Sequence, residues 1–130
     1  MANLILDTHV LRWWSSEPHR LSPTAARAID SADGLAVASV TWFELAWLAQ
    51  HGRIEITMPI RSYLEELAIQ VGTIGTTPGI GATAVALPDS FPGDPVDRII
   101  FATAIETGWS LVTKDDRMHR HDSARQIAIW

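Results

Sequence analysis

Short apolar segments alternate with helical segments along the whole chain of 130 residues. The apolar segments, which predict strands, are residues 3–6, 35–39, 73–77, 109–113 and 126–129. The segments that predict helices are residues 8–14, 22–32, 40–51, 59–71, 80–87 and 94–108. Strands that alternate with helices favour a parallel sheet covered by helices on both faces. We therefore expect an α/β protein that forms one domain over residues 1–130.

Capping residues mark several of the expected helix boundaries. Ser22 and Asp94 each precede a proline, which is the order typical of an N-cap followed by the first helical residue. Gly52 and Gly108 follow helical segments and suit the C-cap position. These boundaries place Asp97 in the first turn of its helix.

The composition favours a folded protein without covalent staples. Hydrophobic residues make up 47% of the chain and charged residues 19%, and cysteine is absent. No apolar run reaches the roughly 18 residues of a membrane span. The apolar start is interrupted by Asp7, His9 and Arg12, which is unlike a signal peptide. We expect a cytoplasmic protein that does not enter a membrane.

The net charge of −5 argues, by itself, against binding to nucleic acid. Acidic residues that gather around metal cations reverse this argument, because the bound cations change the local sign of the charge. The positions of the acids therefore decide what the net charge means.

Four acids occupy positions where a parallel sheet would bring them together. Asp7 and Asp115 follow the first and fourth expected strands, and Glu44 lies near the start of the helix after the second. Asp97 begins the helix that leads to the fourth strand. Functional groups in open parallel sheets gather at the carboxyl ends of the strands. We expect the four carboxylates to meet there if Asp97 turns toward the same edge.

Each acid also has an ordinary structural interpretation. Asp7 suits a helix N-cap, and Asp97 suits the positive end of a helix dipole. Glu44 could pair with a basic residue at the rim of the core, and Asp115 could lie in a solvated loop. It is the placement of the four together that favours a site.

Four neighbouring carboxylates repel one another unless protons or metal ions neutralise them. Oxygen ligands without histidine or cysteine favour Mg²⁺ or Mn²⁺ over zinc. Acids that hold such ions suit phosphodiester hydrolysis, in which the metal activates a water molecule. The sequence thus predicts a metal-dependent hydrolase with Asp7, Glu44, Asp97 and Asp115 as both metal ligands and catalytic residues.

Five motifs occur in an order and spacing that identify a family: LILDTHVLRWW at 4–14, LSPTAARAI at 21–29, ASVTWFELAWLAQHGRIEI at 38–56, GDPVDRIIFATAI at 93–105 and LVTKD at 111–115. With them the chain resembles the PIN-domain ribonucleases of the VapC type, the toxins of bacterial type II toxin–antitoxin pairs. The resemblance implies a three-layer α/β/α sandwich with a central parallel sheet. It also implies cleavage of RNA with Mg²⁺ or Mn²⁺ and neutralisation by a cognate antitoxin.

By motif position, the metal-site acids of the family fall on Asp7, Glu44, Asp97 and Asp115. Thr8 and Thr113 match hydroxyl residues that support these acids. Asp94 matches the first acid of the family's DPxDR pattern, where we expect mainly an N-cap. Asp116 follows Asp115 directly, and Asp115 is the expected ligand.

Other residues could serve RNA or protein partners. The six tryptophans could stack on RNA bases, although at helical spacing they more often fill a core or an interface. Apolar surface on the first helices would suit a homodimer or an antitoxin helix. Five basic residues could flank the acidic pocket and hold phosphates, namely Arg12, Arg53, Arg98, Lys114 and Arg117.

Two other classes of protein remain as alternatives. A receiver-like signalling domain has a similar size and fold, but it needs adjacent acids after the first strand, where this chain has Asp7 followed by Thr8 and His9. A catalytically inactive α/β binding module would have no need of all four acids. His119 and His121 could form a metal pair, but no third ligand is evident, and we expect them in a solvated loop.

Overall fold

The computed structural model describes residues 2–122 and 125–130. The strands in this part of the chain are β1 (Asn3–Leu6), β2 (Gly34–Ala38), β3 (Gly72–Ile74), β4 (Ser110–Val112) and β5 (Ala128–Ile129). The helices are α1 (Thr8–Ser16), the short 3-10 helix η1 (Pro18–Arg20), α2 (Pro23–Asp30), α3 (Val40–Gln50), α4 (Ile60–Gln70), α5 (Pro78–Ala86), α6 (Pro95–Thr107) and α7 (Asp116–Arg120).

The five strands form one sheet in the order β3-β2-β1-β4-β5, and every neighbouring pair is parallel. Strands β2 and β3 lie on one side of β1, and the later strands β4 and β5 lie on the other side. The direction of winding therefore reverses at β1. In an open parallel sheet a crevice forms at such a reversal, outside the carboxyl ends of the strands.

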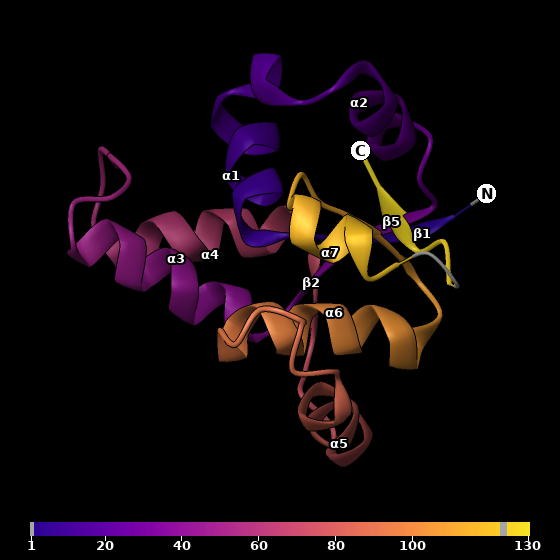
Figure 1. Ribbon diagram of the computed structural model, residues 1–130. Coiled ribbons are helices and arrows are strands. Elements are labelled where there is room, and N and C mark those ends of the chain that lie inside the picture. The colour runs from indigo at the N-terminus through magenta and orange to yellow at the C-terminus, as the bar shows by residue number, and fades with distance from the viewer. Residues whose placement is uncertain (1, 123–124) are drawn as a thin grey trace.

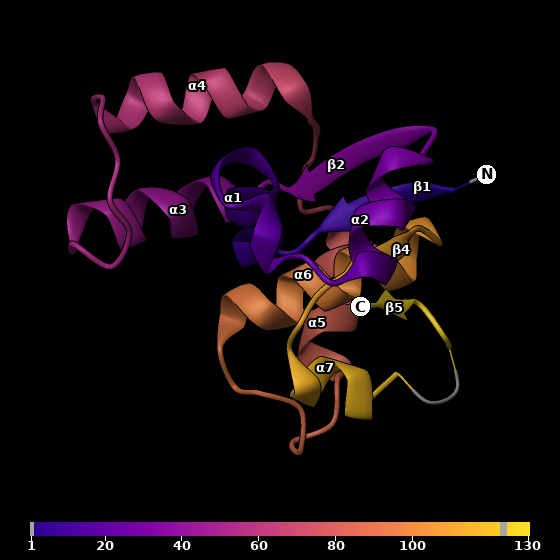
Figure 2. The same ribbon diagram turned by 90° about the horizontal axis from the view of Figure 1, so that it is seen from above.

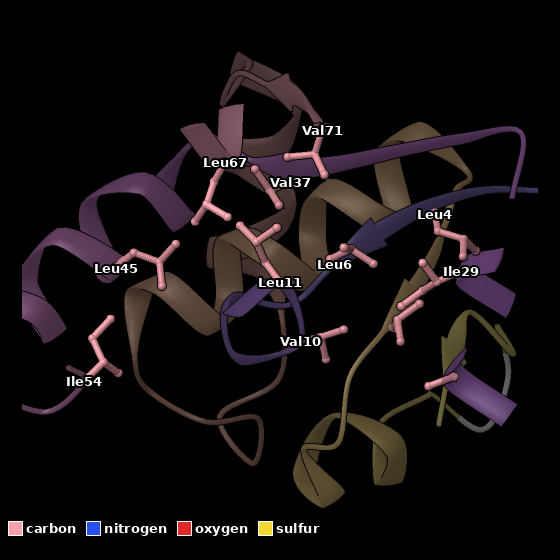
Figure 3. Packing of buried hydrophobic residues seen from close by; sticks show 12 residues of the cluster. Leu4, Leu6, Val10, Leu11, Ile29, Val37, Leu45, Ile54, Leu67 and Val71 are labelled. Carbon is pink, nitrogen blue, oxygen red and sulfur yellow. The ribbon is translucent and has the colours of Figure 1, made fainter. Parts of the chain in front are cut away.

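Helices cover both faces of the sheet, so the predicted three-layer α/β/α sandwich is confirmed (Figures 1 and 2). Successive side chains of a strand point to opposite faces. Leu4 and Leu6 of β1 pack in a core with residues of α1, α2, α3 and α4, part of which Figure 3 shows. Ile5 packs on the other face in a core that includes residues of α6 and α7. Helix α5 packs on α6 through Ile80, Ala84 and Ala102.

Several predicted boundaries are close to the observed ones. Asp94 caps α6 by accepting a hydrogen bond from the Val96 N–H at 2.8 Å. Gly108 ends this helix in the left-handed conformation, with a φ of 73° that suits glycine. Helix α1 runs two residues beyond the predicted end, and the hydroxyls of Ser15 and Ser16 donate to the Arg12 carbonyl there.

Helix α7 was not predicted, and a loop was expected around His119 and His121. Its five residues are too few for a hydrophobic period, and only Met118 among them is buried. Helix α2 ends two residues earlier than predicted and β3 ends three residues earlier. None of the helices in the described part is long and apolar enough to cross a membrane.

Candidate active site

The four predicted acids line one hollow of about 450 Å³ at the carboxyl edge of the sheet. They come from different elements: Asp7 follows β1, Asp115 follows β4, and Glu44 and Asp97 lie on α3 and α6. The complete lining is Asp7, His9, Val10, Trp13, Glu44, Asp94, Asp97, Lys114, Asp115 and Arg117. The sequence did not single out His9 as a lining residue, and it assigned Asp94 mainly to a cap.

Asp7 is the buried acid at the centre of this arrangement. One carboxylate oxygen accepts from the Thr8 N–H at 2.8 Å and the other from the Thr113 hydroxyl at 2.7 Å. The Asp7 N–H in turn donates to the Val112 carbonyl at 3.0 Å, which continues the pairing of β1 with β4. Burial raises the pKa of Asp7, and the bonds from Thr113 and Thr8 oppose this rise. Asp7 therefore caps α1 and also faces the hollow.

Glu44 is half-buried in the second turn of α3. Burial raises the pKa of its carboxyl group, with a further rise from the charge of Asp7 and an opposing effect of the Thr8 hydroxyl. The Thr8 hydroxyl also lies 3.0 Å from the Thr41 hydroxyl, so α1 and α3 meet beside this acid. No basic residue forms an ion pair with Glu44 in residues 2–122 and 125–130. The alternative of a rim acid with a basic partner is thus not the arrangement seen.

Asp97 carries the clearest sign of electrostatic crowding. Burial and the charges of neighbouring acids together raise its pKa from the ordinary value of 3.8 to about 7. Burial has the largest effect, followed in order of size by the charges of Asp7, Asp94, Glu44 and Asp115. An acid with this pKa is about half protonated at neutral pH. The carboxylates therefore act on one another through space, as the sequence predicted for groups that share a site.

Arg98 fixes the position from which Asp97 enters the hollow. Its guanidinium donates to five backbone carbonyls of the segment between α5 and α6 and the end of α5, namely Ala84, Leu87, Pro88, Phe91 and Pro92. These bonds tie the preceding loop to the first turn of α6. Arg98 was considered as a phosphate ligand from the sequence, and its observed role is to hold the backbone.

Asp115 has an environment opposite to that of Asp97. It caps α7 by accepting from the Arg117 N–H at 2.8 Å, and its own N–H donates to the Thr113 hydroxyl at 3.0 Å. The Arg117 guanidinium lies 2.8 Å from the Asp115 carboxylate and lowers its pKa. Asp116 is exposed in the first turn of α7 and does not line the hollow.

Arg117 also lies 3.5 Å from the Asp97 carboxylate, so one guanidinium contacts two of the four acids. Within the described residues, no three acidic or histidine side chains are gathered closely enough to form a ready metal centre. The donor set nevertheless fits a hard cation. It consists of oxygen atoms alone, and burial raises the pKa of three of the acids, Asp7, Glu44 and Asp97. The charges of neighbouring acids destabilise the Asp97 anion further.

The remaining candidates have other partners. Lys114 lines the hollow beside Arg117, whereas Arg12 pairs with Glu17 at 2.8 Å and Arg53 lies over the Trp47 ring. His119 donates from Nε2 to the Thr113 carbonyl at 2.7 Å, and His121 donates to the Ser90 carbonyl at 3.1 Å. These two imidazoles bind backbone on different segments and do not form a pair.

The fold is an all-parallel α/β/α sandwich. Its acidic site lies at the carboxyl edge of the sheet, where the direction of winding reverses. A profile described as the PIN domain matches residues 4–124 of this chain. The chain belongs to the PIN-domain family.

A bacterial ribonuclease matches this chain over the full length of both proteins. Ribonuclease VapC22 of Mycobacterium tuberculosis (strain ATCC 25618 / H37Rv) is 57% identical over 130 residues, which is all of each chain.

Solved structures share the fold at low sequence identity. VapBC-1 from nontypeable Haemophilus influenzae matches with a TM-score of 0.70 and 15% identity, over 94% of this chain and 93% of that one. VapBC-5 from Mycobacterium tuberculosis, a member of the VapBC family of toxin-antitoxin systems, matches with a TM-score of 0.63 and 21% identity, over 95% and 94%. At these identities the likeness establishes the fold.

Proposed function

We propose that this protein is a metal-dependent endoribonuclease that acts in the cytoplasm as the toxin of a toxin–antitoxin pair. One observation carries the proposal: four carboxylates from separate elements line one hollow in a PIN-domain chain that is 57% identical to Ribonuclease VapC22. The whole chain acts as a single nuclease domain in this proposal.

Asp7, Glu44, Asp97 and Asp115 are the proposed ligands of Mg²⁺, with Mn²⁺ as a possible substitute. Such an ion, when bound, lowers the pKa of a water molecule and neutralises charge on the phosphate oxygens. The chain's own contribution is to hold the carboxylates in place. Thr113 and Thr8 bind Asp7, and the Arg98 contacts fix the start of the helix that carries Asp97.

Lys114 and Arg117 are the proposed contacts for RNA phosphates. Both line the hollow, and both carry a positive charge that would attract a polyanion toward an otherwise acidic site. The Arg117 guanidinium contacts the carboxylates of Asp115 and Asp97. We propose that its guanidinium turns to the phosphate once another cation satisfies these acids.

A cognate antitoxin is the proposed protein partner. One solved structure that shares the fold is a toxin–antitoxin complex from Klebsiella pneumoniae, and VapBC-5 belongs to a family of toxin-antitoxin systems. An arginine or lysine of a partner could satisfy the carboxylates as Arg117 does here, and would thereby block the hollow. Apolar surface on the first helices was expected to take part in such contacts; on α1, Trp13 and Trp14 are both half-buried.

The proposed ribonuclease activity is tested by incubating total cellular RNA with the purified protein and mapping the new 5′ ends. We expect cleavage with Mg²⁺ or Mn²⁺, none with excess EDTA, and little with Ca²⁺ because its looser coordination orients water poorly. Asp7→Asn should abolish cleavage while Asp116→Asn, which alters a neighbouring exposed acid outside the hollow, should cleave like the wild type. Full activity in EDTA would refute the metal-dependent mechanism.

The proposed role as a toxin is tested by expressing the protein in bacteria without an antitoxin. Wild-type protein should arrest growth, and the Asp7→Asn variant at the same level should not. High expression without a growth defect and without RNA cleavage would favour the inactive binding module instead. Transfer of a phosphoryl group from a small donor to Asp7 would favour the receiver-like alternative.

A further inference from the structure

Ring side chains follow one another along one face of α3. Phe43 and Trp47 are four residues apart, and His51 at the end of the helix continues the same row. We refer to Phe43, Trp47 and His51 as the ring row. The His51 imidazole is stacked on the Trp47 indole, with ring centroids 4.0 Å apart and planes inclined by 20°. His51 Nδ1 donates to the Trp47 carbonyl at 2.8 Å, which fixes this ring.

The ring row lies on a surface that this chain leaves open. Phe43 is 65% exposed and Trp47 is 42% exposed, whereas Thr41 and Leu45 on other faces of the helix are buried. Helices α3 and α4 project together beyond the sheet, as Figures 1 and 2 show. Large exposed apolar side chains that gather on one face of a helix indicate a binding surface.

The open surface joins the candidate active site directly. A second hollow of about 340 Å³ is lined by Phe43, Glu44, Trp47, Leu48, Asp94 and Val96. Two of these residues, Glu44 and Asp94, also line the first hollow. Its volume lies at the lower end of the roughly 300–1,000 Å³ that hold small organic ligands. The two hollows therefore share part of their lining and are adjacent.

The chemistry of the second hollow suits a nucleobase. Proteins bind single strands with aromatic rings on which bases stack, next to cations that attract the backbone. The Arg53 guanidinium lies 6.0 Å from the Trp47 ring centroid and provides such a cation beside the ring row. The carboxylates of Glu44 and Asp94 disfavour a phosphate within the second hollow itself, so the base enters it and the backbone passes outside.

We infer that Phe43 and Trp47 form a stacking subsite for the base of a single-stranded RNA nucleotide adjacent to the scissile phosphate. This inference rests on the proposed ribonuclease activity. It makes the substrate class unpaired RNA, because a base within a duplex cannot leave its neighbours to stack on α3 without a cost in free energy.

The test combines a protein change with a substrate change. After the cleavage site of a single-stranded RNA has been mapped, oligonucleotides with one abasic nucleotide at each nearby position are cleaved by the wild type, Phe43→Ser and Phe43→Tyr. We expect Phe43→Ser to raise KM about tenfold with little change in kcat, because stacking binds substrate and transition state alike. Phe43→Tyr should retain the wild-type KM. Ile69→Ser, which removes an exposed apolar side chain of α4 that does not line the second hollow, is the matched control and should change neither constant.

The decisive result is the coupling between the two changes. One abasic position should weaken cleavage about tenfold in the wild type and have almost no further effect in Phe43→Ser, since the two changes remove the same contact. Equal abasic effects in both proteins would overturn the inference. So would a Phe43→Ser protein that cleaves normally but sediments in a different oligomeric state, because the ring row would then be an interface between copies. A wild type that cleaves no RNA refutes the proposed function, whereas cleavage without this coupling refutes only the subsite.

Discussion

Thr113 and Asp7 are 106 positions apart in the sequence, and the Thr113 hydroxyl donates to the Asp7 carboxylate at 2.7 Å. The two residues follow β4 and β1, which are paired in the sheet. The Thr113 oxygen also accepts from the Asp115 N–H. A single buried hydroxyl thus positions two of the four acids relative to each other.

Thr113→Val should damage this arrangement while preserving side-chain shape. The Asp7 carboxylate would lose one of two donors, and its pKa would rise further because that hydrogen bond lowers it. We expect the free energy of unfolding to fall by about 1–3 kcal/mol and the affinity for Mg²⁺ at neutral pH to fall several-fold. Denaturant unfolding and calorimetric titration measure the two effects. Thr103→Val is a matched control, since its buried hydroxyl donates within α6 to the Ile99 carbonyl; a similar loss of Mg²⁺ affinity there would contradict the prediction.

Asp97 should make the metal-free protein less stable as the pH rises. The folded-state pKa of about 7 lies above the ordinary value of 3.8, so between these values the unfolded chain is ionised while the folded protein keeps its proton. The free energy of unfolding therefore decreases from about pH 4 to about pH 7. Asp97→Asn should remove much of this slope and stabilise the protein by on the order of 2 kcal/mol at pH 8. Urea unfolding of the wild type and Asp97→Asn at several pH values, with EDTA present, measures the pH dependence of the free energy of unfolding.

Asp116→Asn supplies the control for this pH series, because Asp116 is an exposed acid outside the hollow. Its unfolding curve should follow the wild type at each pH. If Asp97→Asn also follows the wild type, the crowding of charges around Asp97 is not a source of instability.

Arg117 should compete with a metal ion for the same carboxylates. Its guanidinium contacts Asp115 and Asp97 from an exposed position on α7, so the interaction is weak enough to be displaced. Arg117→Gln should raise the affinity for Mg²⁺ about threefold in the absence of RNA. Calorimetric titration measures this affinity, and Arg120→Gln on the same helix but outside the hollow should leave it unchanged. Weaker metal binding by Arg117→Gln would mean that Arg117 helps to organise the acids.

Arg98 should be important for stability rather than for phosphate binding. Arg98→Ala would leave five backbone carbonyls without this donor, and we expect the free energy of unfolding to fall by about 3 kcal/mol. Arg98→Lys should restore little, since an ammonium group has three donors and lacks the planar geometry. Denaturant unfolding measures these changes. Arg61→Ala, on an exposed pair with Glu65, should cost under about 0.5 kcal/mol.

Local patterns predicted most of the fold correctly. The helix that starts at Asp94 and Pro95 and ends at Gly108 follows from capping chemistry that acts within a few residues, and the structure has that helix. Helix α7 was missed because five residues cannot display a period and its cap, Asp115, was interpreted as a metal ligand after the fourth strand and not as a helix N-cap.

The candidate site was predictable in three of its acids and only in part in its cations, since Lys114 and Arg117 of the five basic candidates line the hollow. Asp7, Glu44 and Asp115 follow strands or begin helices at one sheet edge, and that placement depends only on strand order and direction. Arg98 and Arg117 are both basic residues near these acids in the sequence, yet one binds backbone carbonyls and the other binds carboxylates. The partners of a long basic side chain depend on which segments pack around it in the folded protein, and the neighbouring residues in the sequence do not specify these segments.

The sequence by itself determined the alternation of strands and helices, the capping of α6 and the placement of Asp7, Glu44 and Asp115 at one edge of the sheet. These features depend on short-range chemistry and on the alternation of strands with helices. Only the tertiary structure decided that Asp97 shares a hollow with Asp7, that its pKa rises to about 7, and that Phe43 and Trp47 remain exposed beside Glu44. These properties come from burial and from charges on distant segments, and both depend on how separate elements pack in space.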